Sequence, residues 1–480
     1  MNTRSNIRLV TALMIVLIVG AGAAPGQTRD DAIRFSEPGL GVGARSLGMG
    51  NAYTGIANDY SALYWNPAGL SQVRMSEFSA GLSTVGFQNT STFFGAEGYA
   101  SLGGTNVNAI GLLYAIPTTR GGASVAFGYQ RHSNFRRPLT YEAFNPLSTI
   151  VQTWAPNGEY APPDTTLAEN LGLASVDASG RFVSPINDSL TQAGNVTETG
   201  GVDYWSFGGA VDIAKNISVG LTLTYVAGSY HYERAYRETD TRGVYASPAR
   251  YPYDIRQILS DEYIDSDIAG FTTKLGLLYR EPGFFRLGVA VQTPMWMTIR
   301  ETFGTKASSE FYSADANGRS LYSARYDDAT EYDVHSPWIF SAGTSLVLGF
   351  IVLSADADWI DWTTTEFADA PQAVMDENRA LRNDLRGALR GRGGVELDLS
   401  FIRLRAGVIY NQSPYKDDPA EYDQKYLTAG LGIRLGQSAM LDAAYARGWW
   451  QTSHINNDTL SPIFEDVLTN TVLVTLSVRF

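Results

Sequence analysis

Carboxylate and guanidinium side chains recur at alternate positions between residues 356 and 405, where they could bind one another or a charged ligand. A hairpin turn about Ser400 would place Asp398 opposite Arg403. One pair further from the turn, Glu396 would lie opposite Arg405. Cross-strand pairs of opposite charge contribute roughly 0.2–1 kcal/mol each. Two interpretations of these charged strands remain open. In the first, their side chains grip another segment or guide the carboxylate of an amphiphile. In the second, the charges only keep an interior surface hydrated. The set comprises Asp356, Asp358, Arg390, Arg392, Glu396, Asp398, Arg403 and Arg405.

No comparable pattern points to catalysis. The histidines, His132, His231, His335 and His454, are scattered without the spacing of metal ligands. The Gly-rich stretch Val42–Leu70 has the composition of a phosphate-binding loop, but no strand precedes it and no Gly-Lys-Ser/Thr follows it. We therefore expect no catalytic residue, no metal site and no cofactor, and the protein is not predicted to be an enzyme.

The charged positions must be carried by β-strands, and the clearest strand is the last one, Thr471–Phe480. Because a strand turns successive side chains to opposite faces, one face of this segment is apolar and the other mostly polar. A chain that stops on an aromatic after such a strand is typical of an outer-membrane barrel, so Phe480 is the predicted barrel-closing residue. The alternative is the terminal strand of a soluble β-sandwich. The apolar face comprises Val472, Val474, Leu476, Val478 and Phe480.

Upstream, strand-like segments alternate with very short and with long breaks. Long breaks are predicted at 133–200, 233–265, 300–333, 363–386, 413–422 and 452–467. Short turns on one side and long loops on the other are the asymmetry of outer-membrane barrels. With Ser76–Gln88, the count is an even fourteen strands, the others being 107–116, 121–132, 202–213, 216–230, 267–280, 284–298, 335–348, 350–361, 388–399, 401–412, 423–436, 438–450 and 468–480.

Tryptophan positions agree with this arrangement. Tryptophan gathers at membrane interfaces because its ring is apolar while its N–H prefers water. Seven of the nine tryptophans fall at predicted strand ends beside long loops, namely Trp205, Trp296, Trp338, Trp359, Trp362, Trp449 and Trp450.

The composition indicates an exported protein without membrane-spanning helices. Residues 1–26 read as a signal peptide, with Arg4 and Arg8 before the apolar run Leu9–Gly20 and the small residues Ala21–Ala24. The chain is 44% hydrophobic, yet its mean hydropathy is −0.12, so the apolar residues are dispersed as strand alternation requires. It contains no cysteine, and its net charge of −13 argues against a nucleic-acid partner.

Residues 29–75 do not alternate and combine glycines and small residues with an Asn-Pro turn. Asn and Pro favour turns, and small residues permit close approach to a wall. The motifs Gly43–Arg45, Gly48–Gly50, Ala52–Tyr53 and Tyr64–Leu70 resemble those of the FadL-type family of outer-membrane channels for long-chain fatty acids and other hydrophobic compounds. The resemblance implies that this segment folds back into the barrel as a hatch, with Gly48, Gly50, Asn66, Pro67 and Ala68 as hatch residues.

The expected fold class is therefore all-β, a transmembrane antiparallel barrel of about 14 strands in the cell outer membrane. It would comprise a signal peptide (1–26), a hatch (27–75) and a barrel with long extracellular loops (76–480). The resemblance implies passive uptake of hydrophobic small molecules such as long-chain fatty acids, gated by the hatch. Expected partners are outer-membrane lipid, a hydrophobic small-molecule ligand, and the barrel assembly machinery through the C-terminal strand. The motif also occurs in barrels resembling the type IX secretion shuttle, which bind secreted proteins, and that alternative remains open.

Two positions suggest irregularities in the wall. Pro294 cannot donate to a sheet ladder and predicts a bulge or an edge late in 284–298. In the resembled family, an opening in an early strand lets substrate leave sideways into the membrane. That strand would be Gly121–His132 here, with Gly128 as the candidate kink.

Overall fold

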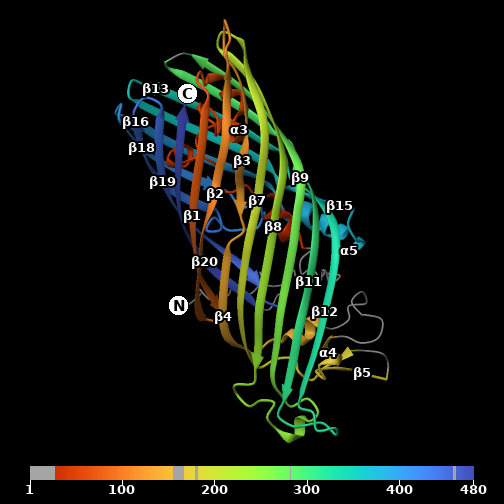
Figure 1. The fold of residues 1–480 in the computed structure, drawn as a ribbon. Helices are drawn as coiled ribbons and strands as arrows, with labels where there is room; N and C mark the ends of the chain where they lie inside the picture. The colour runs from red at the N-terminus through yellow and green to blue at the C-terminus, as the bar shows by residue number, and fades with distance from the viewer. Residues whose placement is uncertain (1–27, 155–166, 179–181, 282, 458–460) are drawn as a thin grey trace, which may run out of the picture.

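In the computed structural model, a closed antiparallel β-barrel surrounds the N-terminal part of the chain (Figure 1). The structure describes residues 28–154, 167–178, 182–281, 283–457 and 461–480, so the predicted signal peptide lies outside the described residues. Within these ranges, fourteen strands pair in a ring that closes between β20 and β1. In ring order they are β1 (Glu77–Phe93), β2 (Ala96–Ile116), β3 (Ala123–Asn134), β7 (Leu190–Ala214), β8 (Ile217–Thr239), β9 (Ile255–Glu281), β10 (Phe285–Gln292), β13 (Ile339–Leu348), β14 (Ile351–Asp361), β16 (Gly387–Asp398), β17 (Ile402–Asn411), β18 (Gln424–Leu435), β19 (Ala439–Ile455) and β20 (Pro462–Arg479).

Further strands extend this wall or lie beside it, and short helices occupy the interior and the loops. None of the described helices is both long and apolar enough to cross a bilayer. The additional strands are β4 (Arg137–Asn145), β5 (Ser175–Val176), β6 (Phe182–Val183), β11 (Trp296–Phe311), β12 (Leu321–His335) and β15 (Glu366–Ala368). The helices are α1 (Arg29–Ser36), α2 (Ala44–Gly48), α3 (Ala62–Trp65), α4 (Leu167–Asn170) and α5 (Gln372–Asp384), with 3-10 turns η1 (Pro67–Gln72), η2 (Ile150–Trp154), η3 (Pro248–Arg250) and η4 (Trp362–Thr364).

The fourteen-strand ring confirms the predicted fold class, but several strands are much longer than predicted. Strands β7, β8, β9, β11 and β12 occupy large parts of the predicted loops 133–200, 233–265 and 300–333, so those loop predictions are wrong. Figure 1 shows these strands running far past the shorter ones at the end away from the C-terminus. The physical reason is that their outward side chains there are polar, as with His231, Glu233 and Arg237 on β8, so the apolar alternation disappears while the ladder continues.

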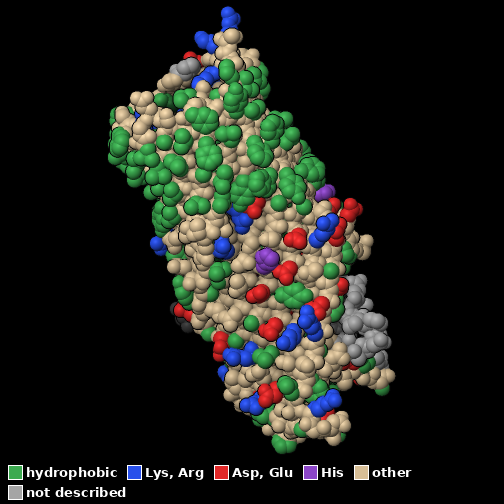
Figure 2. Space-filling view, viewed as in Figure 1, with side chains coloured by type: hydrophobic (Ala, Val, Ile, Leu, Met, Phe, Trp, Pro, Cys, Tyr) green, Lys and Arg blue, Asp and Glu red, His purple; other side chains and the backbone are tan. Residues whose placement is uncertain are grey.

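On the face in Figure 2, apolar side chains form a belt at the end of the barrel that carries the C-terminus, and charged side chains are scattered among uncharged polar surface on the opposite half. Such a belt suits contact with lipid acyl chains. Trp205 lies inside β7, and Trp449 and Trp450 lie inside β19, so the predicted position at strand ends is wrong for these three. The other four, Trp296, Trp338, Trp359 and Trp362, lie at or within two residues of the ends of β11, β13 and β14, as we predicted. The belt includes the exposed residues Ile110, Leu112, Phe127, Phe207, Leu221, Leu223, Leu275, Leu277, Leu427, Val472 and Val474.

The wall is irregular at two places. The strand pattern is interrupted around Pro294, between β10 and β11, where Met295 N donates to Ser336 Oγ at 2.8 Å. The ladder between β3 and β7 shifts register between Arg131 and Ser133, and not at Gly128 as we predicted. Gly128 keeps regular pairing with β2. Glycine is required there for a different reason, since a Cβ would lie 2.2 Å from the hydroxyl of Tyr60.

Three clusters of buried apolar residues fill the described part of the barrel. The largest contains most of the N-terminal segment, defined here as residues 28–75, packed against the wall, and a small one joins Ala44 and Leu47 of that segment to β19 and β20. The remaining cluster lies at the long-loop end, where η2 and α4 pack with β4 onto β7, β8 and β9 through residues such as Ile150, Ala168 and Ile258. The described part of the loop after β3 therefore folds into the mouth of the barrel.

The position of the belt can be tested with two arginine substitutions on the outward face of β8. Leu221 is 41% exposed at the middle of the belt, whereas Ala235 faces outward beyond it. We expect Leu221→Arg to lower the free energy of unfolding in lipid by about 2–4 kcal/mol, because it places a charge among acyl chains. Ala235→Arg should change it by less than about 0.5 kcal/mol. Equal effects in denaturant titrations of the vesicle-inserted protein would show that the belt is misplaced.

Candidate functional site

The N-terminal segment is held to the wall through its backbone. Asp356 on β14 accepts hydrogen bonds at Oδ2 from Tyr53 N at 2.7 Å and from Thr54 N at 2.6 Å. On the other side, Thr475 Oγ1 of β20 accepts from Ala44 N at 3.0 Å. Strands on different sides of the ring therefore hold a segment that has little regular structure of its own.

The predicted residues Asn66, Pro67 and Ala68 form a tight turn against the wall. Asn66 Oδ1 caps η1 by accepting from Ala68 N at 3.1 Å, and Pro67 begins that turn. Asn66 Nδ2 donates to Leu277 O of β9 at 3.2 Å. The wall is hollowed to receive the turn, since a Cβ on Gly220 would lie 2.4 Å from Ala68 N.

The predicted residues Gly48 and Gly50 also meet the wall backbone. A Cβ on Gly48 would lie 3.0 Å from Gly430 Cα of β18. Gly50 has a φ of +61°, and a Cβ there would lie 2.6 Å from Gly393 O and 2.7 Å from Val408 N. Only glycine satisfies both this backbone conformation and this contact.

The charged set divides into two groups. In the first, Arg405 is buried and pairs with Glu396 at 2.7 Å and with Asp442 at 2.6 Å. Arg45 of α2 reaches the same Glu396 at 2.8 Å, which links the N-terminal segment to the wall. Burial lowers the pKa of Arg45, but the neighbouring groups Glu396, Tyr53 and Asp59 together outweigh it, so the pKa is raised above its ordinary value. Near the turn, Arg403 pairs with Asp398 at 3.0 Å.

In the second group, the partners differ from those expected from register alone. Asp358 lies opposite Arg390 in the ladder, yet its carboxylate forms an ion pair with Arg392. Arg390 instead donates through Nη2 to Pro38 O at 2.9 Å. Asp356, opposite Arg392, binds the N-terminal segment as described above. All eight predicted charges thus line one wall. Three of them, Asp356, Arg390 and Glu396, form hydrogen bonds or ion pairs with the N-terminal segment, and the Arg392 guanidinium lies 5.2 Å from the ring centroid of Trp65 in that segment.

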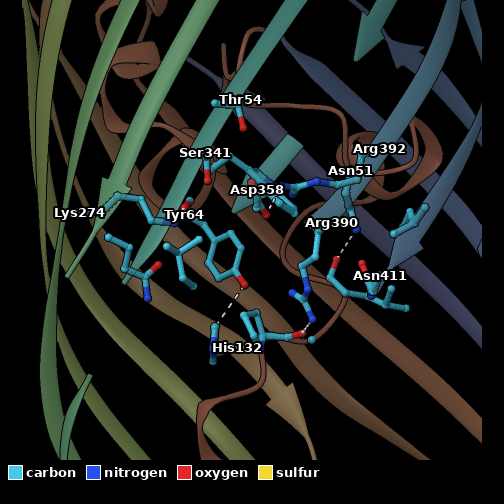
Figure 3. Close-up of a pocket in the computed structure, with 17 residues that line it drawn as sticks. Asn51, Thr54, Tyr64, His132, Lys274, Ser341, Asp358, Arg390, Arg392 and Asn411 are labelled. Atoms are coloured by element: carbon cyan, nitrogen blue, oxygen red, sulfur yellow. Dashed lines mark hydrogen bonds and ion pairs between the residues drawn. The ribbon is translucent and has the colours of Figure 1, made fainter. Parts of the chain in front are cut away.

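The second group borders a small interior cavity (Figure 3). Lys274 of β9, Arg390 and Arg392 supply positive charge, and Asp358 supplies the acidic side chain among its lining residues. Apolar side chains complete the lining, including those of Leu40, Trp65, Ile339 and Ile409. The cavity has room of about 50 Å³ for water, the volume of one or two molecules.

Tyr64 and His132 close one side of this cavity. The hydroxyl of Tyr64 and Nδ1 of His132 are 3.1 Å apart, and the His132 ring stacks on Tyr204 with centroids 4.2 Å apart. Burial raises the pKa of Tyr64, so its hydroxyl stays neutral. Lys274 Nζ donates to the carbonyl of Tyr64 and lies 5.0 Å from its ring centroid.

Sequence reasoning missed Arg45, Lys274 and Asp442 as members of these groups. Arg45 belongs to the Gly-Ala-Arg motif and could have been singled out there. Lys274 is the one charged residue in the stretch Ile268–Tyr279 of β9, and only the ring of strands brings it beside Arg390 and Arg392.

Residues 42–480 match the model of a family described as outer membrane protein transport protein (OMPP1/FadL/TodX). The solved structure of the Pseudomonas putida toluene transporter TodX is similar, with 16% identity, 92% of this chain and 99% of that chain covered, and a TM-score of 0.57. A Pseudomonas aeruginosa FadL homologue has 14% identity over 92% and 99% of the chains, with a TM-score of 0.57. The Ralstonia pickettii toluene transporter TbuX has 14% identity over 92% and 99%, with a TM-score of 0.50. A comparison with curated proteins gave no match. At these identities the solved structures support the fold, and nothing in the comparisons favours a secretion shuttle.

The buried charge group can be tested by Glu396→Gln. The substitution leaves Arg45 and Arg405 without their shared carboxylate, and breaking a buried pair costs about 3–5 kcal/mol of unfolding free energy. The matched control is Asp398→Asn on the same strand, whose pair with Arg403 is partly exposed and worth less than about 1 kcal/mol. Denaturant midpoints of the two variants should differ accordingly. Similar midpoints would mean that the ion pairs of Glu396 do not stabilise the fold.

Proposed function

Because the chain belongs to the FadL/TodX family of outer-membrane transport proteins, we propose that it carries carboxylate-bearing hydrophobic molecules, such as long-chain fatty acids, inward across the outer membrane by passive diffusion. The observation that carries this proposal is the cavity in which Lys274, Arg390 and Arg392 face apolar side chains. Guanidinium and ammonium groups bind carboxylates through charge-assisted hydrogen bonds. An apolar chain with one acidic end matches that lining.

Passage requires the N-terminal segment to move, and we therefore call residues 27–75 the hatch. The room for water in the cavity, about 50 Å³, is far below the roughly 300–1,000 Å³ of ordinary ligand sites. Pro38, Leu40 and Trp65 of this segment occupy the surrounding space. The division into a signal peptide (1–26), a hatch (27–75) and a barrel (76–480) is part of this proposal. So is recognition of the C-terminal strand by the barrel assembly machinery, with the side chain of Phe480 exposed beside it.

The hatch also bridges a break in the wall that gives a sideways route. Pairing between β2 and β3 ends at Ala109 and Gln130. Beyond that point, Asn108 of β2 accepts from Gly43 N at 3.1 Å, and Gly39 N donates to His132 O of β3 at 3.2 Å. The hatch thus supplies hydrogen bonds where the ladder is missing, and its displacement would unseal the wall there.

Gly50→Ala should open the hatch. The new Cβ would lie 2.6 Å from Gly393 O in a backbone conformation that alanine disfavours, so the hatch cannot seat in its present place. Gly436→Ala is the matched control, because Gly436 has a φ of +71° and no atom lies within 4 Å of the position that its Cβ would take. In proteoliposomes, we expect Gly50→Ala to pass a small polar dye that the wild type and Gly436→Ala retain. Equal retention by all three proteins would contradict gating by this segment.

Locking the hatch should have the opposite effect. The protein has no cysteine, and Ala44 N lies 3.0 Å from Thr475 Oγ1, so the double variant Ala44→Cys, Thr475→Cys brings two thiols to one hatch–wall contact, where they can be oxidised directly or joined by a short cleavable cross-linker. Oxidised protein should lose uptake of a labelled long-chain fatty acid in cells, and reduction should restore it. Each single-cysteine variant serves as the control. Undiminished uptake by the fully cross-linked protein would rule out a moving hatch.

A further inference from the structure

Strand β4 lies on the inner side of the region in which β2 and β3 do not pair. Residues of β2 before Ala109 pair with β1, and no described strand pairs with their other edge. Strand β4 crosses the inner face of the β1–β2 hairpin instead: Asn89 Nδ2 donates to Pro138 O at 2.9 Å, and a Cβ on Gly98 would lie 2.3 Å from Thr140 O. We call the space between the free edge of β2 and the β3–β4 connection the seam.

The seam begins at the edge of the apolar belt. The outward residues Ile110, Leu112 and Phe127, in the paired part of β2 and β3, are about half exposed and apolar. At the first outward position of β3 past the last pair, Arg131 forms an ion pair with Asp203 at 2.8 Å. Charged groups at this height indicate the zone of lipid head groups rather than acyl chains.

Around the seam, several side-chain polar atoms are buried without a partner among the described residues, including Nε of Arg131 and Oγ of Ser133 on β3. Two such donors lie on the two sides of the seam itself, Nδ2 of Asn106 on β2 and Nη1 of Arg136 on the β3–β4 connection. The Arg136 guanidinium lies against β2 at a glycine, since a Cβ on Gly104 would lie 2.4 Å from its Cζ. No ion pair of Arg136 occurs in the described part of the chain, whereas the neighbouring Arg137 pairs with Glu465 at 2.7 Å. Leaving a buried guanidinium N–H unpaired is costly, so this arrangement favours an anionic oxygen as its partner.

We propose that the seam is a head-group site on the barrel wall, in which Arg136 and Asn106 bind the carboxylate of a single-chain amphiphile whose tail lies along the outward apolar face of β2 and β3. The ligand class rests on the proposed function, but the site lies outside the cavity of Lys274 and Arg392. A planar guanidinium fork matches a carboxylate. Within the described residues, Nη1 of Arg136 has no hydrogen bond to lose when it turns toward such a ligand.

The site can be located with a photoreactive hexadecanoic acid that carries its diazirine next to the carboxyl end. Purified protein in detergent is labelled, digested and mapped by mass spectrometry. We expect label on peptides containing residues 104–108 or 133–137, besides any label near Arg392. Arg136→Gln should reduce seam labelling about tenfold, the usual effect of losing one charge-assisted hydrogen bond. Arg136→Lys should retain part of it.

Matched controls separate a specific site from general charge. Arg237→Gln removes an exposed arginine whose partner Glu142 lies 3.5 Å away, and it should leave seam labelling unchanged. Gly104→Ala should weaken labelling, because its Cβ takes the place of the guanidinium. The photoreactive alcohol of the same chain length should leave the seam unlabelled. Retention of the compact barrel on unheated gels checks that each variant folds.

Three results would overturn the inference: no label at the seam of the wild type, equal label in Arg136→Gln, or label that phosphatidylglycerol suppresses while unlabelled hexadecanoate does not. The last result would assign the seam to a lipid phosphate. Uptake by cells is scored separately. A wild type that labels at the seam but takes up no fatty acid would contradict the proposed function and leave the head-group site standing.

Discussion

The structure depends on close backbone contact between the N-terminal segment and the barrel wall. Gly48 and Gly50 meet β16, β17 and β18, and the Asn66–Ala68 turn meets Gly220 and Gly276. A methyl group at any of these contacts would push the two layers apart. Because the layers touch, backbone N–H groups of the segment donate to the side chains of Asp356 and Thr475, and the segment fills the barrel with little regular structure of its own.

This contact determines which charges inside the barrel are neutralised. Once Arg45 is brought to the wall, Glu396 faces two guanidinium groups and Asp442 balances the second. Among the residues that line the cavity, the positive charges of Lys274, Arg390 and Arg392 outnumber the negative charge of Asp358. Buried charges are stable only when paired, so the first group is a structural anchor, and Asp356 of the second group anchors the same segment. The positive side chains of Lys274, Arg390 and Arg392 around the cavity are the basis of the proposed binding of an acidic ligand.

The barrel wall is closed partly by strand pairing and partly by the N-terminal segment inside it. Between β2 and β3 the strands pair only within the apolar belt, where unpaired backbone groups would meet acyl chains. Beyond the belt, Asn108 and His132 bond to the hatch instead. The same region holds the unpaired donors of Asn106 and Arg136. The proposed gating, sideways passage and head-group binding all involve one short stretch of incomplete pairing.

The sequence alone determined the features that follow from side-chain alternation and local turns: fourteen strands, the placement of Glu396 opposite Arg405, and a compact turn at Asn66. It misjudged the length of β7, β8 and β9, because outside lipid a strand no longer needs one apolar face. Only the tertiary structure decided that Lys274 joins Arg390, or that Arg136 lies behind β2 with a donor left over. Those neighbours come from strands far apart in the chain, and no local pattern encodes which of them the closed ring brings together.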